Sequence, residues 1–250
     1  MIEQVTLLGV QVQAHTYNSW LAQIETWIKQ GDRLHHVCTV NPEFFVIASQ
    51  NEQFYRVLQQ ADACIADGIG VVWAARLLGK PLPTRVTGTD GLDKIAERAA
   101  MYGWRLFLLG AAEGVAEKAA NVLRERYPRL QIVGTYAGSP AEQEAPSIIQ
   151  RINDSQADIL CVAFGAPTQD LWINQYRHQL CAKVAMGVGG AYDFIAEVVP
   201  RAPKWMQRLG LEWLFRLIQQ PWRWRRMLRL PVFVWLVITR ARRPLYPPLP

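Results

Sequence analysis

This sequence of 250 residues lacks a long hydrophobic run and any clustered cysteines. Its longest apolar run, 232–238, has seven residues, whereas about 20 are needed to cross a bilayer, so no spanning helix is predicted. Residues 1–4 lack the basic start and the following apolar segment of a signal peptide, and none is expected. The four cysteines stand singly without a C-x-x-C pair, which argues against a zinc site or a disulfide framework.

Several catalytic motifs are absent as well. The chain contains no Walker sequence, no G-x-S-x-G and no D-x-D, the usual device for holding a divalent metal against a nucleotide diphosphate. The four histidines show no metal-ligand spacing. A diphosphate substrate would therefore have to be bound by arginines and backbone N–H groups, and neither a metal nor a cofactor is expected.

Charge is distributed unevenly along the chain. The last fifty residues hold 11 of the 27 Lys and Arg, one acid (Glu212) and five of the ten Trp, which leaves 16 basic and 20 acidic residues in the first 200. We therefore divide the chain into a body, 1–200, and a basic, Trp-rich helical appendage, 201–250. Arginines interleaved with Trp predict contact with an anionic membrane surface, and a solvated basic helix is the alternative.

Short apolar runs alternate with longer amphipathic patterns, which predicts an α/β fold with a largely parallel sheet. In such a sheet, ligands bind beyond the carboxyl ends of the strands. Strands are predicted at 5–10, 36–40, 63–65, 105–109, 131–136, 159–163 and 183–187. Helices are predicted at 19–29, 91–101, 114–126, 141–152 and 169–178.

Two polar groups follow predicted strands at this edge. Thr39 and Asn41 end one predicted strand, and Asn41 before Pro42 could serve only as a helix cap. Asp67-Gly68 follows the next strand and opens a helix. A carboxylate there could be a second cap, or a general base beside a turn whose glycine lets an anion approach the backbone.

Three further positions stand out at the starts of helices. Arg85 precedes a helix expected near residue 91, with Thr89 or Asp90 as its cap. A basic residue is unfavourable there unless it faces an anion, so Arg85 is either a phosphate ligand or a surface residue. Gln169, after the expected cap Thr168, carries a donor and an acceptor suited to sugar hydroxyls. Gly189 lies in a glycine-rich turn that suggests backbone pressed against a ligand.

Together these motifs resemble the WecG/TagA/CpsF family of bacterial glycosyltransferases, glycosyltransferase family 26. The resemblance runs from about residue 37 to residue 229, and Asp170 departs from it, because Glu often follows the Gln in this family. The seven matching motifs, in order, are T-V-N at 39–41, A-D-G at 66–68, R-V-T-G-T-D at 85–90, G-A-P-T-Q-D at 165–170, G-V-G-G-A-Y-D at 187–193, R-A-P at 201–203 and G-L-E-W-L-F-R-L at 210–217.

The resemblance implies a Rossmann-like body and an inverting, metal-independent sugar transfer. The donor would be a UDP-sugar carrying N-acetylmannosamine, its uronic acid or glucose, and the acceptor a polyprenyl-diphosphate-linked sugar used for cell-surface polysaccharide. The enzyme would bind peripherally to the cytoplasmic face of the bacterial membrane, and the formation of a homo-oligomer is left open.

The resemblance also assigns roles to residues. Asp67 would be the general base, and Arg85 would lie at the active site. The substrate pocket would be lined by Thr39, Asn41 and Gln169, with the backbone of Gly68 and Gly189 beside them. The appendage would close over this pocket and bind the diphosphates through Arg216, Arg223 and Arg226, although Pro221 is expected to break the helix that would place these arginines on one face.

Two alternatives from other classes remain. A nucleotide-binding oxidoreductase would need a complete G-x-G-x-x-G, but Gly68-Ile69-Gly70 is followed by Trp73 where the third glycine belongs. A non-enzymatic module that binds nucleotide at a membrane surface, or binds nucleic acid through the appendage, leaves the polar groups along the sheet edge unexplained. No nucleic-acid partner is therefore expected.

Overall fold

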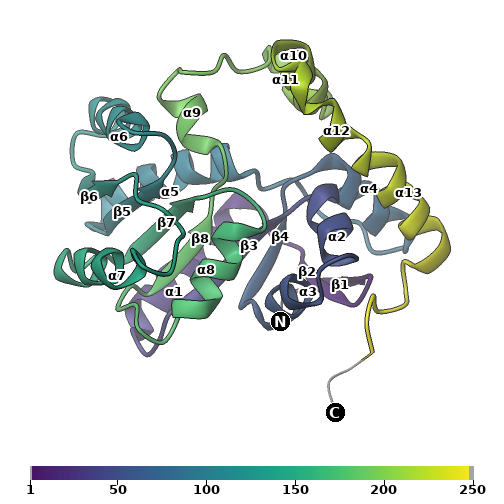
Figure 1. Cartoon of the computed structure of the whole chain (residues 1–250), viewed down its shortest axis with the longest axis horizontal. Helices are drawn as coiled ribbons and strands as arrows, with labels where there is room; N and C mark the ends of the chain where they lie inside the picture. The colour runs from purple at the N-terminus through teal and green to yellow at the C-terminus, as the bar shows by residue number, and fades with distance from the viewer. Residues whose placement is uncertain (1, 248–250) are drawn as a thin grey trace.

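A computed structural model describes residues 2–247 (Figure 1). Its strands are β1 (Gln4–Leu7), β2 (Val10–Gln13), β3 (His35–Val40), β4 (Ala63–Ala66), β5 (Arg105–Gly110), β6 (Gln131–Tyr136), β7 (Ile159–Ala163) and β8 (Val184–Gly187). They form one sheet in the order β1-β2-β4-β3-β8-β7-β5-β6, parallel except where β1 pairs with β2. The predicted α/β fold with a largely parallel sheet is confirmed.

Helices cover the sheet and continue past it into the appendage. Those of the body are α1 (Tyr17–Gln30), α2 (Pro42–Ala48), α3 (Glu52–Gln60), α4 (Ile69–Leu77), α5 (Gly88–Tyr102), α6 (Val115–Arg126), α7 (Ala145–Asp154), α8 (Thr168–Tyr176) and α9 (Ala191–Ile195). Those of the appendage are α10 (Lys204–Leu209), α11 (Glu212–Gln219), the 3-10 turn η1 (Pro221–Arg223), α12 (Trp224–Met227) and α13 (Arg229–Arg240).

Three local predictions were wrong. The strand expected at 5–10 is a hairpin, because Leu8 and Gly9 adopt left-handed φ angles of 52° and 84° and reverse the chain between β1 and β2. The cap of α5 is Thr87, whose hydroxyl accepts a hydrogen bond from the Asp90 N–H at 3.1 Å, so the helix starts earlier than expected. Thr168 does not cap α8 but is its first residue, after Pro167.

The sheet separates apolar clusters that lie on its two faces. One face is packed by α1, α5, α6 and α9, with Trp20 and Leu92 fully buried. The other carries α2, α3 and α4 around Phe45 and Val71. Alternate residues of β3 enter opposite clusters, as expected for a strand buried on both faces.

The appendage follows one side of the molecule, as the yellow-green helices of Figure 1 show. Pro221 ends the continuous helix as expected and starts η1. The last helix, α13, packs on α2 and buries Phe233, Leu236 and Val237 in the cluster that contains Phe45. The Phe233 and Phe45 ring centroids lie 5.7 Å apart. The appendage therefore shares a core with the body. Among residues 2–247, no helix is both long enough and apolar enough to cross a membrane.

Candidate active site

A cavity of about 730 Å³ lies between the carboxyl edge of the sheet and the appendage. The strand ends of β3 and β4 and the turn after β8 form its floor, and α11, η1 and α12 face them from the appendage. All ten residues predicted for the site line this cavity, although they come from seven separate segments of the chain: Thr39, Asn41, Asp67, Gly68, Arg85, Gln169, Gly189, Arg216, Arg223 and Arg226. Their chemical roles remain predictions.

Asp67 has an environment suited to proton transfer. Its backbone N–H donates to the Val40 carbonyl at 2.9 Å, which fixes the residue beside β3. The cap position of α4 is held by Gly68 without any side-chain hydrogen bond, so the Asp67 carboxylate is not used as a helix cap. Burial raises the pKa of Asp67 to about 7, Arg85 opposes that shift, and Glu212 adds to it. A carboxylate with a pKa near 7 is well matched to general-base catalysis.

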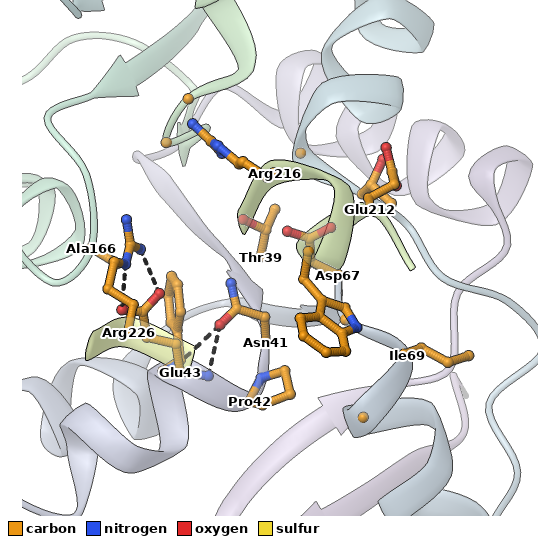
Figure 2. A pocket seen from close by; sticks show the side chains of 18 of the residues that line it. Thr39, Asn41, Pro42, Glu43, Asp67, Ile69, Ala166, Glu212, Arg216 and Arg226 are labelled. Carbon is orange, nitrogen blue, oxygen red and sulfur yellow. Dashed lines mark hydrogen bonds and ion pairs between the residues drawn. The ribbon is translucent and has the colours of Figure 1, made fainter. Parts of the chain in front are cut away.

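Thr39 and Asn41 line the cavity from the end of β3. The Thr39 hydroxyl donates to the Gly187 carbonyl at 3.1 Å. The side-chain oxygen of Asn41 caps α2 by accepting from the Glu43 and Phe44 N–H groups at 2.9 and 3.3 Å. The capping interpretation is thus confirmed for one end of the Asn41 amide, and its NH₂ end points into the cavity (Figure 2).

Gly68 and Gln169 are tightly packed, whereas a Cβ on Gly189 would meet no atom within 4 Å among the described residues. A Cβ on Gly68 would lie 2.6 Å from Pro42 Cδ, so glycine is required here for the approach of α4 to α2. Gln169 is nearly fully buried, and its side-chain oxygen accepts from the Gly189 N–H at 3.0 Å. Gln169 therefore shapes the glycine-rich turn, whose Gly189 adopts a left-handed φ of 53°.

Arg85 joins the body to the appendage. Its Nη2 donates to the Gln207 carbonyl in α10 at 2.7 Å, and its Nη1 lies 3.9 Å from the Glu212 carboxylate. The guanidinium also acts electrostatically on Asp67. Of the two interpretations offered by the sequence, a free surface arginine is excluded.

Arg216 and Arg223 supply positive charge opposite the floor. The Arg216 guanidinium lies 4.8 Å above the Phe194 ring, and its buried Nε has no hydrogen-bond partner among the described residues. Burial, together with the charges of Arg216 and Arg226, lowers the pKa of Arg223 to about 10. Neither Arg216 nor Arg223 forms an ion pair within residues 2–247. Bound phosphate would relieve this concentration of positive charge.

Arg226 is arranged differently from the other two arginines. Its Nε donates to the Glu43 carboxylate at 2.9 Å (Figure 2). Arg229 pairs with the same carboxylate. Burial would raise the pKa of Glu43, but the two arginines outweigh burial and lower it. Sequence reasoning missed this pairing, because Glu43 fits an ordinary first turn of α2 and its partners lie far along the chain.

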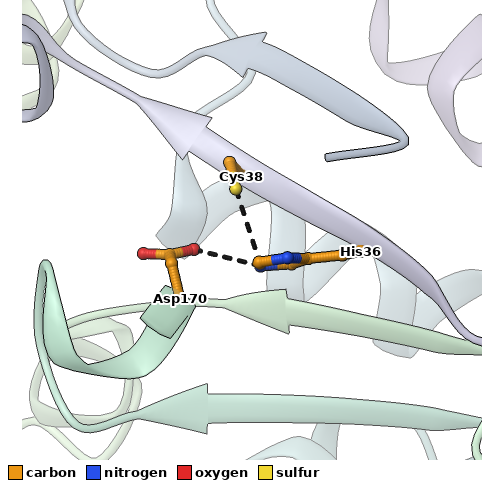
Figure 3. Close-up of side chains that lie close together, drawn as sticks. All are labelled: His36, Cys38 and Asp170. Carbon is orange, nitrogen blue, oxygen red and sulfur yellow. Dashed lines mark hydrogen bonds and ion pairs between the residues drawn. The ribbon is translucent and has the colours of Figure 1, made fainter. Parts of the chain in front are cut away.

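A second polar cluster lies in the core beside the cavity (Figure 3). His36 Nε2 lies 3.4 Å from an Asp170 carboxylate oxygen and 3.5 Å from Cys38 Sγ, and all three side chains are buried. Their ligand atoms are close enough to hold a metal ion. However, burial raises the pKa of the Cys38 thiol well above its usual range, and only the thiolate is a good ligand. We interpret the cluster as a link between β3 and the first turn of α8.

Comparison with known proteins identifies the family. Residues 5–246 match the model of the glycosyl transferase WecG/TagA/CpsF family. The chain belongs to this family. The resemblance drawn from the seven motifs is confirmed, and this family member is a glycosyltransferase, so the oxidoreductase alternative is wrong.

Two relatives of this glycosyltransferase illustrate the similarity. A Bacillus spizizenii protein is 35% identical over 224 residues, which cover 90% of this chain and 86% of the relative. A Staphylococcus aureus protein is 30% identical over 241 residues, covering 96% and 94%. Both relatives are named N-acetylglucosaminyldiphosphoundecaprenol N-acetyl-beta-D-mannosaminyltransferase.

Proposed function

We propose that this glycosyltransferase moves a sugar from a UDP-sugar to a polyprenyl-diphosphate-linked sugar, with inversion at the anomeric carbon and without a metal ion. The observation that carries the proposal is that Asp67, whose pKa is about 7, lines the same cavity as Arg216 and Arg223. A base and a cluster of cations on opposite sides of a pocket meet the two needs of sugar transfer from a nucleotide diphosphate.

The names of the relatives support a narrower choice of substrates. Both name N-acetylmannosamine as the transferred sugar and N-acetylglucosaminyldiphosphoundecaprenol as the acceptor. We therefore place N-acetylmannosamine first among donor sugars, ahead of its uronic acid and of glucose. The product would be a lipid-linked intermediate of cell-surface polysaccharide.

The chemical step is one in-line displacement. The acceptor hydroxyl oxygen attacks the anomeric carbon and forms the new glycosidic bond, while its proton passes to the Asp67 carboxylate. The bond from the anomeric carbon to the UDP oxygen breaks, and UDP leaves with the electron pair. Arg216 and Arg223 stabilise the negative charge on the leaving diphosphate, the role that a metal fills in other enzymes.

The surface of the appendage supports attachment to an anionic membrane at the cytoplasmic face. Four of its Trp side chains are more than half exposed: Trp205, Trp222, Trp224 and Trp235. Arginines occur among them, as in segments that lie at the interface of an anionic bilayer. The enzyme would bind an acceptor with a polyprenyl tail where this surface contacts the membrane.

UDP release provides the test of this function. The full chain, with UDP-N-acetylmannosamine and a lipid-linked N-acetylglucosamine diphosphate, should release UDP in the presence of EDTA and form a product whose anomeric NMR signal shows inversion. The uronic acid and glucose donors serve as comparisons. The absence of transfer from every UDP-sugar would refute the proposal, and loss of activity in EDTA would refute its metal independence.

Replacing Arg223 with Gln should raise KM for the UDP-sugar about 10–100-fold. The reason is the loss of a charge-assisted contact worth roughly 1.5–3 kcal/mol. Steady-state kinetics of UDP release measure the change. Arg242→Gln removes the same charge from a part of the appendage outside the cavity and should leave KM unchanged. Equal effects of both variants would mean that Arg223 acts only through net charge.

Replacing Trp222 and Trp224 with Ser should weaken binding to anionic vesicles at least about tenfold. Each exposed indole contributes apolar area at the interface, and tenfold corresponds to ~1.4 kcal/mol. Sedimentation with phosphatidylglycerol vesicles measures this binding. Met101→Ser with Tyr102→Ser removes exposed apolar side chains from α5 and serves as the control. Unchanged sedimentation of the double Trp variant would exclude this part of the appendage from the membrane contact.

A further inference from the structure

A series of charged side chains of alternating sign runs from Asp90 through Arg201 and Glu212 of the appendage to Arg85. The Asp90 carboxylate, in the first turn of α5, accepts from Arg201 Nη1 at 2.5 Å. Arg201 Nε donates to Glu212 at 3.2 Å, and Glu212 lies 3.9 Å from Arg85. Arg85 in turn acts on Asp67. Two of these groups, Arg201 and Glu212, belong to the appendage, so the series is complete only when the appendage lies on the body.

Glu212 has a distinctive place in this series. It is the one acid among residues 201–250 and the first residue of α11. Its two carboxylate oxygens face different arginines, Arg201 and Arg85. Figure 2 shows Glu212 and Asp67 on the same side of the cavity. Arg85 therefore interacts with two carboxylates: it lies 3.9 Å from Glu212 of the appendage, and its charge acts on Asp67 of the body.

We propose that Glu212 is a positioning residue by which the appendage holds Arg85 away from the catalytic base. With Glu212 in place, Arg85 is also held by the Gln207 carbonyl, and both contacts come from the appendage. Without Glu212, Arg85 would close on Asp67 as a direct ion pair and stabilise the ionised carboxylate, which makes a weaker base. The contact of α10 and α11 with Arg85 therefore prepares the base.

The charges around Asp67 shift its pKa in the directions that this role requires. Burial is the main cause of its raised pKa, Arg85 lowers the pKa, and Glu212 and Asp90 raise it. The Gly88 backbone N–H also favours the ionised form, and the Tyr17 hydroxyl is a further titratable group that interacts with Asp67. Among these groups Glu212 alone belongs to the appendage, so it alone links the appendage to the pKa of the base.

The inference rests on the proposed role of Asp67, and its test separates the two. The full chain, labelled with ¹³C at the Asp side-chain carboxyls, is titrated by NMR, and Asp67→Asn identifies the Asp67 signal. Glu212→Gln should lower the Asp67 midpoint by about 0.5–1 pH unit and move the acidic limb of kcat by the same amount. Glu212→Asp retains the charge and should restore most of the shift.

The same substitution of Glu212, made in a protein that already lacks Arg85, tests whether Glu212 acts through Arg85. In Arg85→Gln protein, the shift caused by Glu212→Gln should fall to less than half, whereas direct repulsion between two carboxylates would leave it unchanged. Glu97→Gln, which changes a half-exposed acid of α5 outside the cavity, is the control and should not move the midpoint. An Asp67 midpoint that stays constant in folded Glu212→Gln protein overturns the inference. If the wild type transfers no sugar, the proposed function is refuted. The NMR titration still shows whether Glu212 shifts the pKa of Asp67.

Discussion

Replacing Asp67 with Asn should lower kcat by about 10²–10⁴-fold, because the amide cannot accept the proton of the attacking hydroxyl. Binding of UDP should change far less, because the phosphate contacts come from other residues. In the wild type, kcat should fall as the pH drops through about 7, where Asp67 becomes protonated. Steady-state UDP release between pH 5.5 and 9 measures both effects. Near wild-type turnover by the Asn variant would sink the assignment.

The same substitution should stabilise the fold at pH 8. The pKa of Asp67 is raised from 3.8 to about 7, so the folded protein disfavours the ionised form. The folded state is therefore destabilised progressively from about pH 4 to pH 7, and the full penalty persists above pH 7. Asn carries no such penalty. Tm should rise by ~2–4 °C for each kcal/mol recovered, more at pH 8 than at pH 5. An unchanged Tm at pH 8 would contradict the burial of this carboxylate.

Deleting residues 201–250 should abolish the stable fold as well as catalysis. Phe233, Leu236 and Val237 are buried against α2, and each contributes about 1.5–3 kcal/mol. A whole domain has only about 5–15 kcal/mol of stability. The C-terminal segment adds the Tyr246–Tyr55 ring pair at 5.3 Å and a hydrogen bond from the Tyr246 hydroxyl to the Ser49 carbonyl at 3.1 Å. We expect an aggregating or partly folded product in circular dichroism and thermal melts.

Two point variants on α13 separate packing from surface contact. Phe233→Ala should cost about 3–5 kcal/mol of stability. Trp235 lies two residues away and is more than half exposed, so Trp235→Ala should change the free energy of unfolding by at most about 0.5 kcal/mol. Urea unfolding measures both. A fragment 1–200 that melts cooperatively at the wild-type temperature would show that α13 contributes nothing to the core.

Much of the fold follows from local patterns. The strand at 159–163 matches β7, because a buried parallel strand is a continuous apolar run between turns. The strand at 131–136 also matches β6, an edge strand in which only Ile132 is buried. The hairpin at Leu8 and Gly9 was missed because one apolar run continues through it. The start of α5 was misplaced because Thr87, Thr89 and Asp90 are all good caps, and tertiary packing selects among them.

The site was predictable where strand ends bring residues to one edge. Asp67 and Asn41 follow neighbouring strands, so the sheet alone places them together. The pairs Glu43–Arg226 and Glu212–Arg85 could not be predicted, because each joins segments distant in sequence and depends on how the appendage lies on the body. Composition separated the appendage from the body by charge, but it gave no sign that α13 enters the same core.

The packing of α13 on one side only determines how the cavity can be presented to a lipid. Its inner side is locked into the core through Phe233 and Leu236, while Trp235 and Ile238 remain outside. A helix fixed in this way cannot swing freely to follow a membrane. Any bilayer that engages its outer side would thus set the tilt of the entire molecule, so the mouth of the cavity would meet incoming lipid carriers at one fixed angle.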